Sequence, residues 1–70
     1  GYTGRSVVEA CARRGLATVA HVRPDSARLA EWRRLFADMG ATVDETPWAH
    51  DAMAATLRRV RPTHVFVLVG

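Results

Sequence analysis

The sequence lacks several features on which particular classes of protein depend. It has one cysteine, so no internal disulfide can form, and all ten of its basic residues are arginine, so it has no lysine. No apolar run approaches the roughly 18 residues that a membrane-spanning helix needs, and the first residues lack the pattern of a signal peptide. It also has no cluster of metal ligands. We therefore expect a cytoplasmic protein with no membrane partner.

The charge of the sequence is modest, with a net value of +3 spread along 70 residues. Paired arginines fall on the outer or C-terminal parts of expected helices, where cations complement the helix dipole. Aromatic residues do not interleave with these arginines as single-stranded nucleic acid would require. A solvated surface explains the charge better, and we expect no nucleic-acid partner.

Apolar periodicity divides the sequence into alternating helices and strands. The expected elements, beginning with a helix, are 5–14, 16–22, 27–39, 41–45, 51–60 and 64–69. Strict alternation with short connections is typical of a parallel sheet with helices on both faces. The expected fold class is therefore α/β, in a single domain.

Glycine, proline and capping residues mark the ends of these elements. Gly15 and Gly40 are expected to close the first two helices in the left-handed conformation, and Pro62 to stop the third. Asp25 or Ser26 is expected to cap the second helix. The residues expected on the inner faces of the helices are Val7, Val8, Cys11, Leu29, Trp32, Phe36, Met39, Met53, Leu57 and Val60.

An alternating unit that begins with a helix lacks the strand that should precede it. In a doubly wound sheet with strand order 3-2-1-4, that strand lies between 16–22 and 64–69. We therefore expect a fragment of a Rossmann-type doubly wound parallel sheet that lacks its first strand and its C-terminal half. The remainder of the same chain would be its partner, and a gap one strand wide would separate 16–22 from 64–69.

The first five residues, Gly-Tyr-Thr-Gly-Arg, have the spacing of a glycine-rich dinucleotide loop cut after its first glycine. One glycine would let the backbone approach a pyrophosphate, and the other would let the helix pack closely on a strand. The helix that follows would direct its free N–H groups and positive dipole end at the phosphates. Two glycines three residues apart are common, so the segments that follow carry more of the argument.

Together, these features resemble the N-terminal cofactor-binding part of the atypical and extended short-chain dehydrogenase/reductase superfamily. The similarity is closest to its NmrA-like and isoflavone-reductase-like branch. The matching segments are Gly-Tyr-Thr-Gly-Arg at 1–5, Val-Arg at 22–23, Gly-Ala-Thr-Val at 40–43 and Val-Phe-Val-Leu-Val-Gly at 65–70. The resemblance covers nearly the whole chain and implies that residues 1–70 are a partial NAD(P)-binding Rossmann domain.

The resemblance also implies which residues hold the cofactor. Arg23 stands near the position where NAD-binding relatives carry an acidic residue, and an arginine there is typical of NADP preference, because a guanidinium can pair with a 2′-phosphate. Arg28 is a second candidate cation. Trp48 would border the adenine, although Pro47 replaces the acidic residue of the relatives. The implied cofactor-binding residues are Gly1, Tyr2, Thr3, Gly4, Arg5, Arg23, Arg28, Trp48 and Gly70.

The implied function is NADP(H) binding, with NAD as the alternative cofactor, in an oxidoreductase that transfers hydride to or from a small organic substrate. Two alternatives stay open: a non-catalytic NmrA-like regulator that senses the dinucleotide, and an NAD-dependent epimerase or dehydratase of the extended family. No residue is a credible catalytic acid, base or nucleophile. The family's Tyr-x-x-x-Lys, or the lone lysine of the isoflavone-reductase-like branch, would lie beyond Gly70.

The other candidate residues have simpler structural explanations. His21 and His64 are expected to be structural histidines with satisfied hydrogen bonds. His50 and Asp51 follow a strand on its ligand side, but a helix cap explains that pair equally well. Trp48 is either a core residue or a wall of the adenine site.

Overall fold

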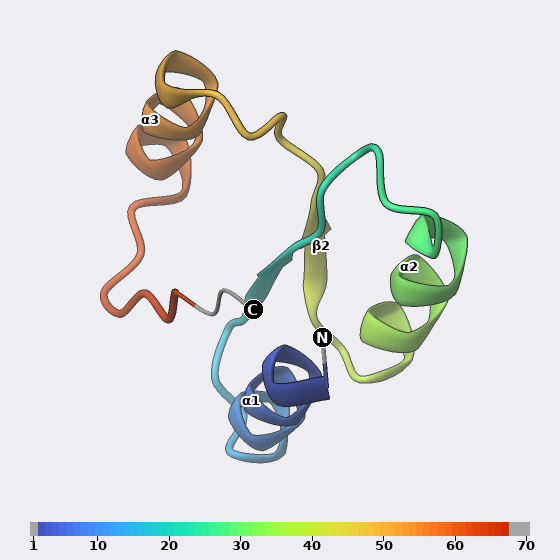
Figure 1. The fold of residues 1–70 in the computed structure, drawn as a ribbon. Coiled ribbons are helices and arrows are strands. Elements are labelled where there is room, and N and C mark those ends of the chain that lie inside the picture. The colour runs from blue at the N-terminus through green and yellow to red at the C-terminus, as the bar shows by residue number, and fades with distance from the viewer. Residues whose placement is uncertain (1, 68–70) are drawn as a thin grey trace.

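A computed structural model describes residues 2–67, with Tyr2 described by its backbone alone (Figure 1). Its elements, in chain order, are α1 (Tyr2–Arg13), β1 (Val19–His21), α2 (Leu29–Asp38), β2 (Thr42–Asp44) and α3 (His50–Val60). Figure 1 shows α1 and α3 on opposite sides of the two strands, with α2 beside β2. The expected alternation of helix and strand is therefore confirmed from α1 to α3, in a small mixed α/β fold.

The sheet in the described residues consists of β1 and β2, which pair in parallel. Val19 lies opposite Thr42 and His21 lies opposite Asp44, so the two strands end at the same edge. Both strands are three residues long. The segments 16–22 and 41–45 were thus predicted in the right places but too long, although hydrogen bonds from Thr42 to the Thr18 carbonyl and from Val22 to the Asp44 carbonyl extend just beyond the two strands.

The core lies between the sheet and the inner face of α2. Its buried residues are Ala20 and Val22 from the β1 segment, Phe36 from α2, and Ala41 just before β2. The rings of Trp32 and Phe36, one helical turn apart, stack with their centroids 5.5 Å apart. The residues packed around this core are Val8, Leu29, Trp32, Met39 and Val43, which confirms the inner face expected for α2.

Both helices that lead into a strand end in a glycine with positive φ, as expected. The φ angles are 71° at Gly15 and 85° at Gly40. After α2, the Ala41 N–H donates to the Phe36 carbonyl oxygen at 3.0 Å, and α1 ends with the equivalent bond. This is the Schellman pattern, in which a left-handed residue lets the chain reverse onto the helix it leaves. Arg61, with φ 52°, ends α3 immediately before the expected proline.

We expect Gly40→Ala to lower the free energy of unfolding by about 1 kcal/mol, because an L side chain is strained at positive φ. A Cβ at Gly40 would meet no atom within 4 Å, so the backbone conformation alone causes the loss. Urea denaturation measures it. Gly40→Asn is the matched control and should lose less, since asparagine tolerates this conformation better. An alanine variant as stable as the wild type would contradict the explanation.

The predicted starts of the first two helices were wrong. Helix α1 begins at Tyr2 rather than residue 5, so Thr3, Gly4 and Arg5 lie in its first turn and not in a preceding loop. Helix α2 begins at Leu29, and its N-cap is Arg28 with no side-chain capping bond. The Ser26 hydroxyl instead accepts the Arg28 N–H at 3.3 Å, within the turn before the helix. The expected cap at Asp25 or Ser26 is therefore absent.

The third predicted strand was also wrong as far as the structure describes it. Residues 64–67 form no strand, and 68–70 lie outside the described residues. Val65, Phe66 and Val67 are 61%, 64% and 70% exposed. None of the inner residues predicted for α3 is buried, and Leu57 is 45% exposed. Since the described sheet ends at β1, no strand lies beneath the inner face of α3.

Candidate functional site

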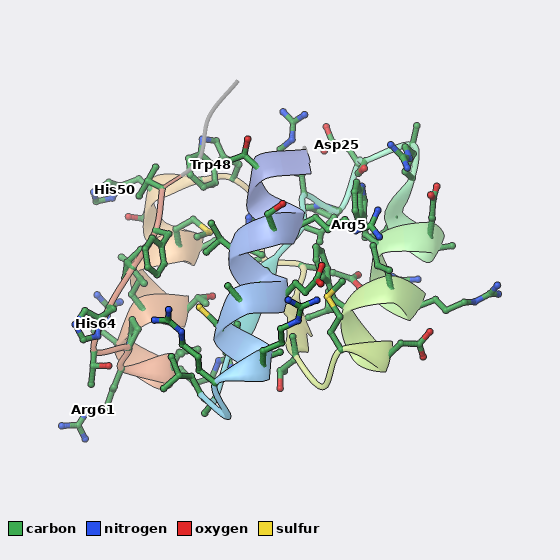
Figure 2. All side chains as sticks on the ribbon, turned by 90° about the horizontal axis from the view of Figure 1, so that it is seen from below. Arg5, Asp25, Trp48, His50, Arg61 and His64 are labelled. Carbon is green, nitrogen blue, oxygen red and sulfur yellow. The ribbon has the colours of Figure 1, made fainter. Side chains whose placement is uncertain are left out.

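The candidate site lies at the edge where the parallel strands end. The start of α1 and the segments that follow β1 and β2 converge there, and Figure 2 shows Asp25 and Trp48 toward that end of α1. Arg61 lies toward the opposite end. Ligands of open α/β sheets bind at the carboxyl ends of the strands. Three of the segments singled out in the sequence therefore meet at one edge.

The first turn of α1 directs backbone N–H groups toward this edge. The first four N–H groups of a helix have no intrahelical acceptor, and α1 has no acidic residue in its first turn. Its positive dipole end is therefore not neutralised by a side chain within that turn. Gly4 is half-buried there, whereas Gly1 lies outside the described residues.

The side chain of Arg5 turns toward α2 rather than toward the edge (Figure 2). It borders a surface groove of about 440 Å³ between α1 and α2, together with Glu31 and Asp38. Only the backbone of Arg5 is therefore positioned for the phosphate role that the sequence suggested.

Arg23 follows the β1 segment directly and is exposed. The turn after it is held by the Ser26 N–H, which donates to the Arg23 carbonyl oxygen at 3.0 Å. Within residues 2–67, the Arg23 guanidinium has no hydrogen bond or ion pair. A cation without a partner, fixed by its backbone at the ligand edge, can take an anionic group without first giving up another contact.

Arg28, the other candidate cation, is already engaged. Its guanidinium donates to both carboxylate oxygens of Glu31, at 3.0 and 2.7 Å, and its Cζ lies 4.8 Å from the centroid of the Trp32 ring. The hydrogen bond from Arg28 lowers the pKa of Glu31, with smaller contributions from the charges of Arg28 and Arg5. Arg28 would have to exchange this carboxylate for a phosphate, so Arg23 is the better placed of the two.

Trp48 is 66% exposed, which rules out the core alternative for this residue. Its ring lies 5.7 Å from the ring of His21, centroid to centroid, and tilted by 44°. His21 is half-buried, and its Nε2 lies 2.8 Å from the carbonyl oxygen of Thr46. Since a carbonyl only accepts, Nε2–H is the donor in this hydrogen bond. His21 is thus a structural histidine, as predicted, and it also forms one side of the Trp48 surface.

A side-chain network that the sequence analysis missed positions the loop carrying Trp48. The Thr46 hydroxyl donates to Asp44 Oδ1 at 2.8 Å and lies 2.6 Å from the Thr56 hydroxyl. Because the Thr46 proton is used on Asp44, Thr56 must be the donor in the second bond. The network joins β2 to α3. Its one visible sign in the sequence is the Asp-x-Thr spacing, which is typical of a side-chain-stabilised turn.

An ion pair between Arg33 and Glu45 joins α2 to the residue after β2. Arg33 donates through Nε to one carboxylate oxygen and through Nη2 to the other, the latter at 2.6 Å. These hydrogen bonds are the main cause of the lowered pKa of Glu45, and the charge of Arg33 adds to it. The pair fixes the start of the loop that leads to Trp48.

We expect the Arg33–Glu45 ion pair to make the free energy of unfolding fall as the pH is lowered into the acid range. A carboxyl with a lowered folded-state pKa stabilises the fold above its unfolded pKa, about 4.3, and this contribution is lost as pH falls through the lower folded value. Glu45→Gln should therefore lose less stability than the wild type between neutral pH and about pH 3. Arg33→Gln should reduce the acid dependence of stability in the same way. The double variant should show no further reduction when stability is measured by urea denaturation. An unchanged acid dependence in Glu45→Gln would contradict this.

The remaining candidates do not join the site. His50 and Asp51 start α3, but the N-cap is Ala49 and no side chain caps it, so the capping explanation for this pair was wrong. Their side chains are fully exposed, with 3.4 Å between His50 Nδ1 and Asp51 Oδ1. His64 is exposed, and its Nδ1 lies 3.2 Å from the Thr63 hydroxyl. Gly70 lies outside the described residues.

Comparisons with protein-family models, with curated proteins and with solved structures find no match for this chain. Over residues 2–67, no helix has the length and apolar character needed to cross a membrane. The same residues contain no group of three histidine, cysteine or acidic side chains that could hold a metal ion. The proposed function therefore rests on the geometry at the edge of the sheet where β1 and β2 end.

Proposed function

We propose that this chain is the NADP(H)-binding portion of an oxidoreductase similar to the short-chain dehydrogenases/reductases, acting on a small organic substrate. The observation that carries the proposal is the convergence of three anchors at one edge of the sheet. They come from three separate elements: the first turn of α1, the unpaired Arg23 after β1, and the exposed Trp48 after β2. Backbone donors, a cation and an aromatic surface match a pyrophosphate, a 2′-phosphate and an adenine.

Each anchor has a chemical role in this proposal. The N–H groups at the start of α1, and its dipole, hold the pyrophosphate. Arg23 pairs with the 2′-phosphate through two charge-assisted hydrogen bonds and so favours NADP over NAD. Trp48 stacks on the adenine, with the ring of His21 behind it. The bound dinucleotide supplies the hydride chemistry, while these residues bind and orient it.

The fold we propose for the whole domain is a doubly wound sheet of the Rossmann type. Two parallel strands joined through α2, and the apolar residues Val65, Phe66 and Val67 across the hollow that β1 lines, support that topology. The central strand of such a sheet would lie between β1 and residues 64–67.

An NmrA-like regulator that senses the dinucleotide without turning it over would use the same anchors. The chain has no lysine, so the catalytic lysine of the reductases is not among residues 1–70. An NAD-dependent epimerase or dehydratase would favour NADH over NADPH, because its site would not bind a 2′-phosphate. The cofactor preference therefore separates this last class from the other two.

Calorimetric titration of the protein with NADPH and with NADH tests the proposal. We expect saturable binding of both, with NADPH the tighter by at least tenfold, since the Arg23 contact exists for NADPH alone. Tighter binding of NADH than of NADPH would point to the epimerase class, and equal affinities would contradict the role given to Arg23. Absence of heat with both nucleotides would contradict dinucleotide binding altogether.

A further inference from the structure

The surface groove between α1 and α2 is separate from the nucleotide anchors, because none of Gly4, Arg23 and Trp48 lines it. Its volume of about 440 Å³ falls within the range of about 300–1,000 Å³ that small-molecule sites occupy. One side chain of α1 and five residues of α2 line it: Arg5, Ala30, Glu31, Arg34, Leu35 and Asp38. The groove therefore combines charged side chains of both signs with an aliphatic surface.

Three of the charged side chains in the groove have no ion-pair partner within residues 2–67. Arg34 and Asp38 lie one helical turn apart but do not pair with each other, and Arg5 also forms no ion pair. Helix pairs of this spacing are favoured when the acid comes first, as in Glu9–Arg13, whose side chains lie 2.6 Å apart. The order is reversed in α2, so two cations and a carboxylate stay available to a ligand.

We propose that this groove binds a zwitterionic α-amino acid with an uncharged aliphatic side chain. The carboxylate of the ligand accepts hydrogen bonds from Arg5 and Arg34, and its ammonium group donates to Asp38. The ligand's side chain packs on Leu35, which is half-buried in the groove wall. Glu31 takes no part, because both of its carboxylate oxygens accept from Arg28.

The charges in the groove select a ligand that carries both signs. A ligand with only a carboxylate is repelled by Asp38, and a ligand with only an ammonium group is repelled by Arg5 and Arg34. The Cβ atoms of residues four apart on a helix lie about 5–6 Å from each other. Arg34 and Asp38 can therefore reach two charged groups as close together as those of an α-amino acid.

The probe is L-leucine, added to the protein without nucleotide while backbone amide shifts are followed by NMR. We expect saturable shifts at Arg34 and Asp38 and none at Arg23. Two analogues with the same aliphatic side chain each lack one charge: isocaproate has no ammonium group, and isoamylamine has no carboxylate. Each should bind at least fivefold more weakly than L-leucine, since an exposed ion pair of about 1 kcal/mol corresponds to about fivefold in affinity.

Two variants of α2 locate the binding surface. Arg34→Gln and Asp38→Asn should each weaken L-leucine binding at least fivefold, and neither breaks an ion pair within residues 2–67. Arg58→Gln and Asp51→Asn remove the same charges from α3, outside the groove, and should leave binding unchanged. Isocaproate binding as tight as that of L-leucine would make the groove a simple anion site and overturn the proposal. Absence of saturable shifts with L-leucine, or unchanged affinity in both α2 variants, would equally overturn it.

Discussion

Gly4→Val should abolish dinucleotide binding while leaving the helix content nearly unchanged. Gly4 is half-buried in the first turn of α1, where the backbone would approach the phosphates and, in the proposed domain, the helix would pack on the central strand. A β-branched side chain would fill that space and push the helix away. Helix α1 itself would lose nothing, because valine has a higher helix propensity than glycine. NADPH titration beside far-ultraviolet circular dichroism measures the two effects separately.

Two variants in the same turn serve as controls for Gly4→Val. Gly4→Ala should cost less affinity than the valine, since its side chain is smaller. Thr3→Val keeps a β-branched side chain at an exposed position and removes only the hydroxyl, so it should bind NADPH nearly as well as the wild type. If Gly4→Val binds NADPH with unchanged affinity, the glycine serves only to form a turn, and α1 does not hold the phosphates.

Arg23→Ala should weaken NADPH binding by at least tenfold and leave NADH binding nearly unchanged. A hydrogen bond to a charged group is worth about 1.5–3 kcal/mol, and about 1.4 kcal/mol corresponds to tenfold in affinity. The Arg23 guanidinium has no other partner within residues 2–67, so its removal should break no contact inside the protein. Dissociation constants for both nucleotides provide the measurement.

Arg23→Asp should go further, because it would repel the 2′-phosphate and offer an acceptor to the ribose hydroxyl of NADH. Arg14→Ala, at the other end of α1, removes the same charge and should keep the wild-type preference. A ratio of NADPH to NADH affinity within about twofold across wild type and both Arg23 variants would show that Arg23 does not recognise the 2′-position. Arg28 would then be the remaining candidate, at the cost of its contacts with Glu31.

The features of the fold that could be predicted from sequence are those with local causes. Gly15 and Gly40 were recognised because a left-handed residue after a helix favours glycine, and Pro62 because it cannot continue a helix. The strand expected at 64–69 failed within 64–67 for a non-local reason. A strand exists only when a neighbour pairs with it, and β1 pairs with β2 alone in the described residues.

For the candidate site, too, some features could be predicted from the sequence and others could not. Arg23 and Trp48 follow strands, and parallel strands bring their ends together, so their shared edge could be expected from order alone. The contact of His21 with Trp48, and the Thr46–Thr56 bond that holds the loop, could not. Those contacts depend on how the loop after β2 folds back toward α3, which no short-range pattern encodes.

The most direct test of the account is the location of NADPH on the protein. An NMR titration followed through backbone amides and the Trp48 indole N–H would map it residue by residue. We predict saturable shifts at Thr3, Gly4, Arg23 and Trp48, and none at Arg61, which lies toward the opposite end of the molecule. Saturable shifts around Arg61 with none at the strand ends, or no saturable shifts anywhere, would contradict the proposal that this edge binds a dinucleotide.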